Sequence, residues 1–144
     1  MKVANFMIPL KDLVHLPEDS TVDEVSQMML NSHIGSVIIT KKTEDKTLAL
    51  GLITKTDLVR IYTSGKENAG KDKIGPFLKK KIVIVSKEEE RVKVAEFMIK
   101  NGFHHILVGN ESNQIVGMVS SLDVAREFVE DDKDTVRSIY FVLS

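Results

Sequence analysis

Short runs of branched aliphatic residues alternate along this chain with longer segments in which apolar residues recur every three or four positions. Runs of the first kind predict buried strands, and segments of the second kind predict amphipathic helices. Val22, Val25 and Met29, for example, would share one face of a helix. The pattern predicts strands over residues 13–16, 37–40, 48–53, 82–85, 106–108 and 115–119, helices over 22–31, 55–63 and 121–131, another helix that ends near residue 100, and a short helix over 2–8.

The predicted elements occur twice in the same order. From residue 13 to residue 40, the first half matches the second at a constant offset of 69 positions, and from residue 51 onward the offset is 66. A first hairpin loop that is three residues longer accounts for the whole difference. Because a duplicated unit indicates a repeat architecture, we divide the chain into a first domain (1–66), a second domain (67–131) and a C-terminal extension (132–144), with a polar, glycine-containing linker at 64–73.

Each half reads as strand–helix–strand–strand–helix, which predicts an α/β (α+β) fold made of two pseudo-symmetric units. A unit of about 60 residues is marginally stable alone. We therefore expect the two sheets to pack against each other around one shared core. Two clefts are expected, each at the place where the joint between a strand and a helix meets the opposite half.

The most specific repeated feature is a ten-residue stretch at that joint, which occurs at residues 51–60 and again at 117–126. Each copy has glycine, two apolar residues, a hydroxyl residue (Thr54 or Ser120), two further residues and an aspartate (Asp57 or Asp123). The pattern fits a capping box, in which the hydroxyl and the aspartate close the first turn of a helix. It equally fits a ligand site. A helix N-terminus can hold a phosphate, and a nearby carboxylate can accept hydrogen bonds from both hydroxyls of a ribose. The sequence leaves both interpretations open.

Composition and charge exclude several classes of protein. The chain has 144 residues, a formal net charge of -1 and no cysteine, so disulfides and thiolate metal sites are excluded. The balanced charge and the lack of tryptophan argue against a nucleic-acid-binding surface. No apolar run reaches the ~20 residues that cross a bilayer, and the N-terminus lacks a signal-peptide pattern. We therefore expect a cytoplasmic protein that does not bind membranes.

No catalytic motif is found in the sequence. It contains no nucleophile elbow, no Walker loop and no zinc-protease helix motif. In the expected architecture, Asp57 and Asp123 lie too far apart to act as an acid–base pair. The adjacent pair His104–His105 would point to opposite faces of a strand, and no cysteine or carboxylate nearby completes a metal site. We therefore expect neither an enzyme nor a metal site.

At this point the chain resembles a tandem pair of cystathionine-β-synthase (CBS) domains, also called a Bateman module. The resemblance rests on the two Gly-apolar-apolar-Ser/Thr-x-x-Asp motifs, on Met7-Ile8-Pro9 and on the stretch at residues 14–22. It implies a regulatory module that binds AMP, ADP, ATP or S-adenosylmethionine between the repeats, forms a homodimer and signals to an effector protein that the sequence does not identify. The alternative is a ligand-free scaffold for dimerisation or interaction.

The resemblance also assigns residues to two ligand sites. The aspartate would hold the ribose hydroxyls, the hydroxyl residue would reach the ribose or phosphate, and the base would lie against the first strand and the turn of the opposite half. One site would comprise Ser120, Asp123, Leu13, Val14, Ile34, Gly35, His104 and His105; the other would comprise Thr54, Asp57, Lys55, Ile82, Val83, Phe103 and His104.

The sequence departs from the resemblance in its basic residues. Related phosphate-binding modules often carry a basic pair with arginine in the turn, and this chain has His104–His105, which is only partly charged at pH 7. Residues 79–81 are lysines that could supply positive charge to the Asp57 site or form a solvated face.

Overall fold

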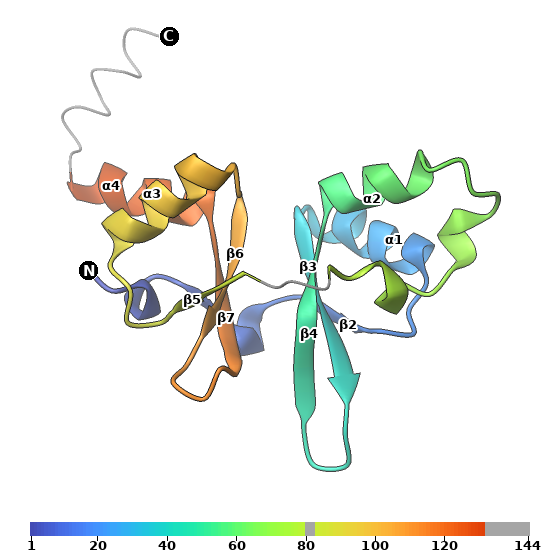
Figure 1. Cartoon of the computed structure of the whole chain (residues 1–144), viewed down its shortest axis with the longest axis horizontal. Coiled ribbons are helices and arrows are strands. Elements are labelled where there is room, and N and C mark those ends of the chain that lie inside the picture. The colour runs from blue at the N-terminus through green and yellow to red at the C-terminus, as the bar shows by residue number, and fades with distance from the viewer. Residues whose placement is uncertain (80–82, 132–144) are drawn as a thin grey trace, which may run out of the picture. The chain divides into compact units, whose positions relative to one another are not determined.

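The computed structural model describes residues 1–79 and 83–131, which form two compact units (Figure 1). Of the described residues, 11–79 form one unit, which we call the first-repeat unit. Residues 1–10 and 83–131 form the other, the second-repeat unit. Each holds one copy of the predicted strand–helix–strand–strand–helix order. The prediction of a mixed α+β fold built from two repeats is therefore confirmed.

In the first-repeat unit, two helices cover one face of a three-stranded sheet (Figure 1). Strand β2 (His15–Pro17) is parallel to β3 (Ser36–Lys42), and β3 is antiparallel to β4 (Thr47–Thr54). Helix α1 (Val22–Ser32) is capped by the Thr21 hydroxyl, and α2 (Lys55–Tyr62) follows β4 without a break. The apolar faces of both helices meet the sheet in a core that includes Val22, Val25, Met29, Val37, Ile39, Ile53, Leu58 and Ile61.

The second-repeat unit has the same arrangement with one additional strand. Its sheet has the order β1–β7–β6–β5, made of β1 (Ile8–Pro9), β5 (Ile84–Ser86), β6 (His105–Gly109) and β7 (Ile115–Ser120). Helix α3 (Arg91–Asn101) ends at Gly102, whose φ of 69° favours glycine. Helix α4 (Ser121–Asp131) follows β7 directly. The core includes Val3, Val94, Met98, Ile106, Val108, Val119 and Val124.

The duplication extends to an irregularity of the backbone. The register of β3 and β4 shifts between Ile39 and Thr40, and that of β6 and β7 shifts between Val108 and Gly109. These residues are equivalent in the two repeats. A bulge bends a strand and increases its twist, so both hairpins deviate from regular pairing at the same point.

Each unit includes a segment that precedes the other repeat in the sequence, here called its lead segment. The lead segment of the second-repeat unit is residues 1–8, and that of the first-repeat unit is residues 72–79. The Val3 amide donates to the carbonyl of Glu89 at 2.8 Å, and the Ile74 amide donates to the equivalent carbonyl of Ser20 at 2.8 Å. Both Val3 and Ile74 are fully buried. Each lead segment contains a short 3-10 turn, η1 (Val3–Asn5) or η4 (Gly75–Phe77). The lead segments are therefore core components of the units to which they are bound.

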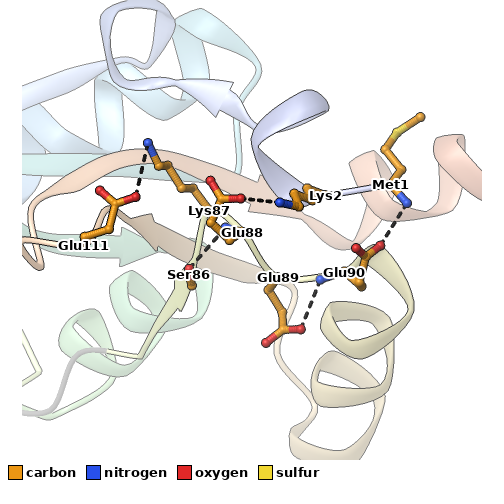
Figure 2. A network of polar contacts seen from close by, with 8 residues as sticks. All are labelled: Met1, Lys2, Ser86, Lys87, Glu88, Glu89, Glu90 and Glu111. Atoms are coloured by element: carbon orange, nitrogen blue, oxygen red, sulfur yellow. Dashed lines mark hydrogen bonds and ion pairs between the residues drawn. The ribbon is translucent and has the colours of Figure 1, made fainter.

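Exposed ion pairs hold the lead segment of the second-repeat unit at its outer end (Figure 2). Lys2 donates to Glu88 at 2.6 Å, and the Met1 amino group lies 3.0 Å from a carboxylate oxygen of Glu90. The hydrogen bond from Lys2, followed by its charge, lowers the pKa of Glu88 from its ordinary value of 4.5. The same hydrogen bond and the charge of Glu88 raise the pKa of Lys2 from 10.5.

Two local expectations from the sequence are wrong. The short helix expected over residues 2–8 is the single turn η1 followed by strand β1, where Ile8 and Pro9 pair with β7. The expected linker at 64–73 is folded in its second half, where Ala69 is buried in η3 (Ala69–Lys71) and packs into the core of the first-repeat unit. The domain boundary at residue 66 stays a prediction, and the extension at 132–144 lies outside the described residues.

Candidate functional site

The first candidate site is the joint between β4 and α2. Thr54 ends the strand in an extended conformation and caps the helix. Its amide and its hydroxyl both donate to Oδ2 of Asp57, at 2.9 and 3.0 Å, and the Asp57 amide donates back to the hydroxyl at 3.4 Å. The capping box predicted from the sequence is therefore present here.

The second candidate site, between β7 and α4, repeats this geometry. The amide and the hydroxyl of Ser120 both donate to Oδ2 of Asp123 at 2.8 Å. The Asp123 amide donates to the Ser120 hydroxyl at 3.1 Å. The same atoms thus make the same three bonds in both joints. Two of the three bonds end on one carboxylate oxygen, Oδ2, in each case.

The second carboxylate oxygen of each aspartate faces a cation. Oδ1 of Asp57 lies 3.8 Å from Nζ of Lys79, and Oδ1 of Asp123 lies 3.6 Å from a guanidinium nitrogen of Arg126. Both aspartate side chains are 11% exposed, whereas the Lys79 and Arg126 side chains are 60% and 67% exposed. Each joint therefore presents a largely buried carboxylate whose second oxygen faces an exposed cation.

The turn that precedes the central strand is bound to the joint of its own unit. The Lys55 amide donates to the carbonyl of Gly35 at 3.2 Å, and the Ser121 amide donates to that of His104 at 2.8 Å. The His104 side chain is exposed, and His105 begins β6 opposite Ser120. The structure thus brings Gly35 close to the Asp57 joint and His104 close to the Asp123 joint.

The residues expected to contact the base have mixed environments within their own units. Phe103 packs on the core of the second-repeat unit, with its ring centroid 5.8 Å from that of Phe97. Val14 and Ile34 are half-buried against the core of the first-repeat unit, and Leu13 is half-buried. Val83 is 38% exposed, and Ile82 lies outside the described residues. Their assignment to ligand sites stays a prediction.

Arg126 was not predicted to contact Asp123, although it belongs to the repeated stretch. Its position three residues after Asp123 on a helix is the signal that could have identified it. Of the lysines at 79–81, the structure describes Lys79 and brings it to Asp57. Over the described residues, no group of three or more histidine and acidic side chains is arranged to hold a metal ion. In the same residues, no helix is long and apolar enough to cross a membrane.

The fold and the repeated joint define a class of protein built from two copies of one small α+β domain. The family model for the CBS domain matches residues 3–64 and 74–130. The chain therefore belongs to the CBS domain family.

Curated relatives match most of this chain. The chain is 27% identical over 84% of its length to the CBS domain-containing protein CBSX3, mitochondrial, of Arabidopsis thaliana, and covers 59% of that protein. It is 23% identical over 76% of its length to an uncharacterized 17.7 kDa protein of Acidianus ambivalens, of which it covers 63%. The chain thus spans about six-tenths of the length of each of these relatives.

Solved structures share the fold at low sequence identity. The crystal structure of CBSX2 in complex with AMP matches with a TM-score of 0.76 and 15% identity, over 91% of this chain and 98% of that one. The CBS domain of a bacterial CNNM/CorC family Mg2+ transporter in complex with ATP matches with a TM-score of 0.72 and 18% identity, over 90% of this chain and 87% of that one.

Proposed function

We propose that this chain is a non-enzymatic regulatory module that binds an adenosine-containing ligand at the Asp57 and Asp123 joints. The candidate ligands are AMP, ADP, ATP and S-adenosylmethionine. The observation that carries the proposal is the repeated carboxylate, in which one oxygen is fixed by the cap and the other faces an exposed cation. An oxygen of this kind can accept hydrogen bonds once the cation turns away.

The chemistry of a ribose suits this acceptor. Its two neighbouring hydroxyls are donors, and a carboxylate at the end of a strand is a common partner for them in nucleotide sites. The bonds from Thr54 and Ser120 hold the two carboxylates in place before any ligand arrives, which lowers the entropic cost of binding. The N-terminus of the following helix favours a phosphate nearby.

The comparisons support the ligand class at the level of the family. One structural neighbour is described in complex with AMP and another in complex with ATP. Both are below 20% identity to this chain, so the likeness extends to the fold, and the ligand of this chain is our proposal. The contacts to the base that the sequence assigns to the opposite repeat belong to the same proposal.

The output of the module would be a change in its contacts with other chains. Large apolar side chains are exposed at equivalent positions of the two repeats, namely Leu30 on α1 at 69% and Ile99 on α3 at 83%. Such side chains support self-association, and we propose a homodimer in the cytoplasm that signals to a separate effector protein. Sedimentation velocity of the chain and of its Leu30→Ser and Ile99→Ser variants tests the dimer.

Calorimetric titration with AMP, ATP and S-adenosylmethionine tests ligand binding. We expect saturable binding of at least one ligand by the chain, and its loss from one site in Asp57→Ala or Asp123→Ala. Asp45→Ala is the matched control, because Asp45 is exposed in the hairpin loop between β3 and β4. Absence of heat with every ligand, from protein that unfolds cooperatively, would contradict the proposal.

The alternative is a ligand-free scaffold, and one observation favours it. Both capping boxes are complete within the protein, so the motif has a structural role without any ligand. Under this alternative, Asp57→Ala and Asp123→Ala would each lower the free energy of unfolding by ~1 kcal/mol, and no ligand would change the unfolding midpoint. A ligand-dependent rise in the midpoint that Asp57→Ala or Asp123→Ala abolishes would reject it.

A further inference from the structure

The two joints share their capping bonds but differ in the charges around them. At the Asp57 joint the cation comes from the lead segment, because Lys79 lies 3.8 Å from Oδ1 of Asp57. At the Asp123 joint the cation is Arg126, from the same helix as the aspartate. The equivalent of Arg126 in the first repeat is Arg60, also on the helix after the joint. The lead-segment lysine is therefore the feature peculiar to the Asp57 joint.

The repeat register shows what replaces that lysine in the other unit. Ile74 and Val3 occupy equivalent places, since their amides donate to equivalent carbonyls. The residue five positions after Ile74 is Lys79, and the residue five positions after Val3 is Ile8, which pairs with Met118 in the sheet. A second difference also adds positive charge to the Asp57 joint. Exposed Lys55 begins α2, whereas uncharged Ser121 begins α4.

These differences bear directly on the ligand. A ribose that donates to Oδ1 of Asp57 takes over the acceptor that Lys79 now faces, so the ammonium must find another negative group. A ligand with a 5′-phosphate supplies that group within reach of a long, exposed side chain. Adenosine has only a neutral hydroxyl at that place, and its binding leaves the ammonium without a nearby negative group.

We infer that Lys79 makes the Asp57 joint selective for phosphorylated adenosine ligands over adenosine. This inference rests on the proposed function of the joints. It assigns Lys79 as a specificity-determining residue, with Lys55 adding positive charge beside it.

The test compares ATP with adenosine by calorimetry at the Asp57 joint, in an Asp123→Asn background that removes the charge of the other joint. We expect Lys79→Met to weaken the binding of ATP by about two- to fivefold, the size of one exposed charge contact, and to leave the binding of adenosine unchanged or tighter. Lys79→Arg should retain the preference for ATP. Raising the salt concentration should weaken the binding of ATP and leave the binding of adenosine unchanged.

Lys66→Met is the matched control. Lys66 is 62% exposed in the same unit and pairs with Asp72 at 2.7 Å, so this variant also removes one surface lysine from an ion pair. It should leave the ratio of ATP to adenosine affinity unchanged. Thermal unfolding of each variant verifies that it is folded.

The outcomes separate the two proposals. In the Asp123→Asn background, ATP binding that Asp57→Asn abolishes, combined with an equal change of ATP and adenosine affinity in Lys79→Met, would overturn the inference about Lys79. The binding function would then stand. If the wild-type chain binds none of AMP, ADP, ATP, S-adenosylmethionine and adenosine, the proposed function is overturned, and the inference with it. Equal affinity of the Asp57 joint for ATP and adenosine in the Asp123→Asn background would also overturn the inference.

Discussion

The amide of Ile74 donates to the carbonyl of Ser20 at 2.8 Å, and the Ile74 side chain is fully buried in the core of the first-repeat unit. Ile74 precedes the second repeat in the sequence, yet it packs with the first. Each family-model match accordingly covers a stretch of sequence that is not identical to a compact unit. Each unit therefore contains, besides its own repeat, the lead segment that precedes the other repeat in the sequence.

We predict that Ile74→Ala lowers the free energy of unfolding of the first-repeat unit by about 2–4 kcal/mol, because it leaves a cavity in a packed core. Val59→Ala is the matched control, since Val59 lies in the same unit and is 61% exposed, and should change stability by less than about 0.5 kcal/mol. Urea unfolding of both variants measures the difference. Equal effects of the two substitutions would show that the lead segment is not part of the core.

Gly117 provides a second prediction. It is the first residue of the repeated stretch and lies where β1 pairs with β7. A Cβ atom at residue 117 would lie 2.6 Å from the carbonyl oxygen of Ile8 and 2.8 Å from the sulfur of Met7. We expect Gly117→Ala to displace β1 and to cost about 1–3 kcal/mol. Hydrogen exchange should be faster within the paired strands β1 and β7 and unchanged in β3, which lies in the other unit. Unchanged exchange throughout β1 and β7 would mean that β1 moves aside without loss of pairing.

Much of the fold could be predicted because the repeat offers two independent samples of one pattern. Strands β3 and β6 and helices α1 to α4 follow from apolar periodicity, which decides local structure wherever one face is buried. The short helix over 2–8 failed for a physical reason. Val3 and Phe6 have helical spacing, but their burial comes from a distant part of the chain, and periodicity does not report the partner.

The site was predictable to the extent that it is local. Thr54 and Asp57 are three residues apart, so their bonds follow from helix geometry alone. The pairing of Lys79 with Asp57 joins residues 22 positions apart, and the sequence left those lysines undecided between site and solvent. The burial of Ala69 and Ile74 could not be predicted for the same reason. Their partners in the core are distant in the sequence, and the glycine and charged residues around them indicate only a loop.

The capping role of Thr54 can be measured separately from ligand binding. We predict that Thr54→Ala lowers the free energy of unfolding by ~1 kcal/mol, because the Asp57 amide and one carboxylate oxygen each lose a partner. Thr54→Ser keeps the hydroxyl and should cost less than about half of that amount. Urea titration without ligand measures both. The same pair of substitutions at Ser120, to Ala and to Thr, should repeat the order, and a Thr54→Ala variant as stable as the wild type would show that the cap contributes nothing.

The pair Lys2–Glu88 predicts a defined pH window for the stability of the second-repeat unit. The hydrogen bond from Lys2 lowers the pKa of Glu88 in the folded state, so its contribution is present above pH 4.5 and is lost as the pH falls through the folded value. The pKa of Lys2 is raised, so its contribution is present below pH 10.5 and is lost as the pH rises through the folded value. We therefore expect Glu88→Gln to lower the urea midpoint at pH 7.

That difference should shrink as the pH falls below 4.5, because the wild-type carboxyl then becomes neutral as well. Lys2→Met should reproduce the effect of Glu88→Gln, and the double variant should add little, because each substitution removes the same interaction. Molar salt should reduce the difference at pH 7, since both groups are exposed and screening is strong at that concentration. A difference that persists undiminished far below pH 4.5 would assign the effect of Glu88→Gln to packing and not to charge.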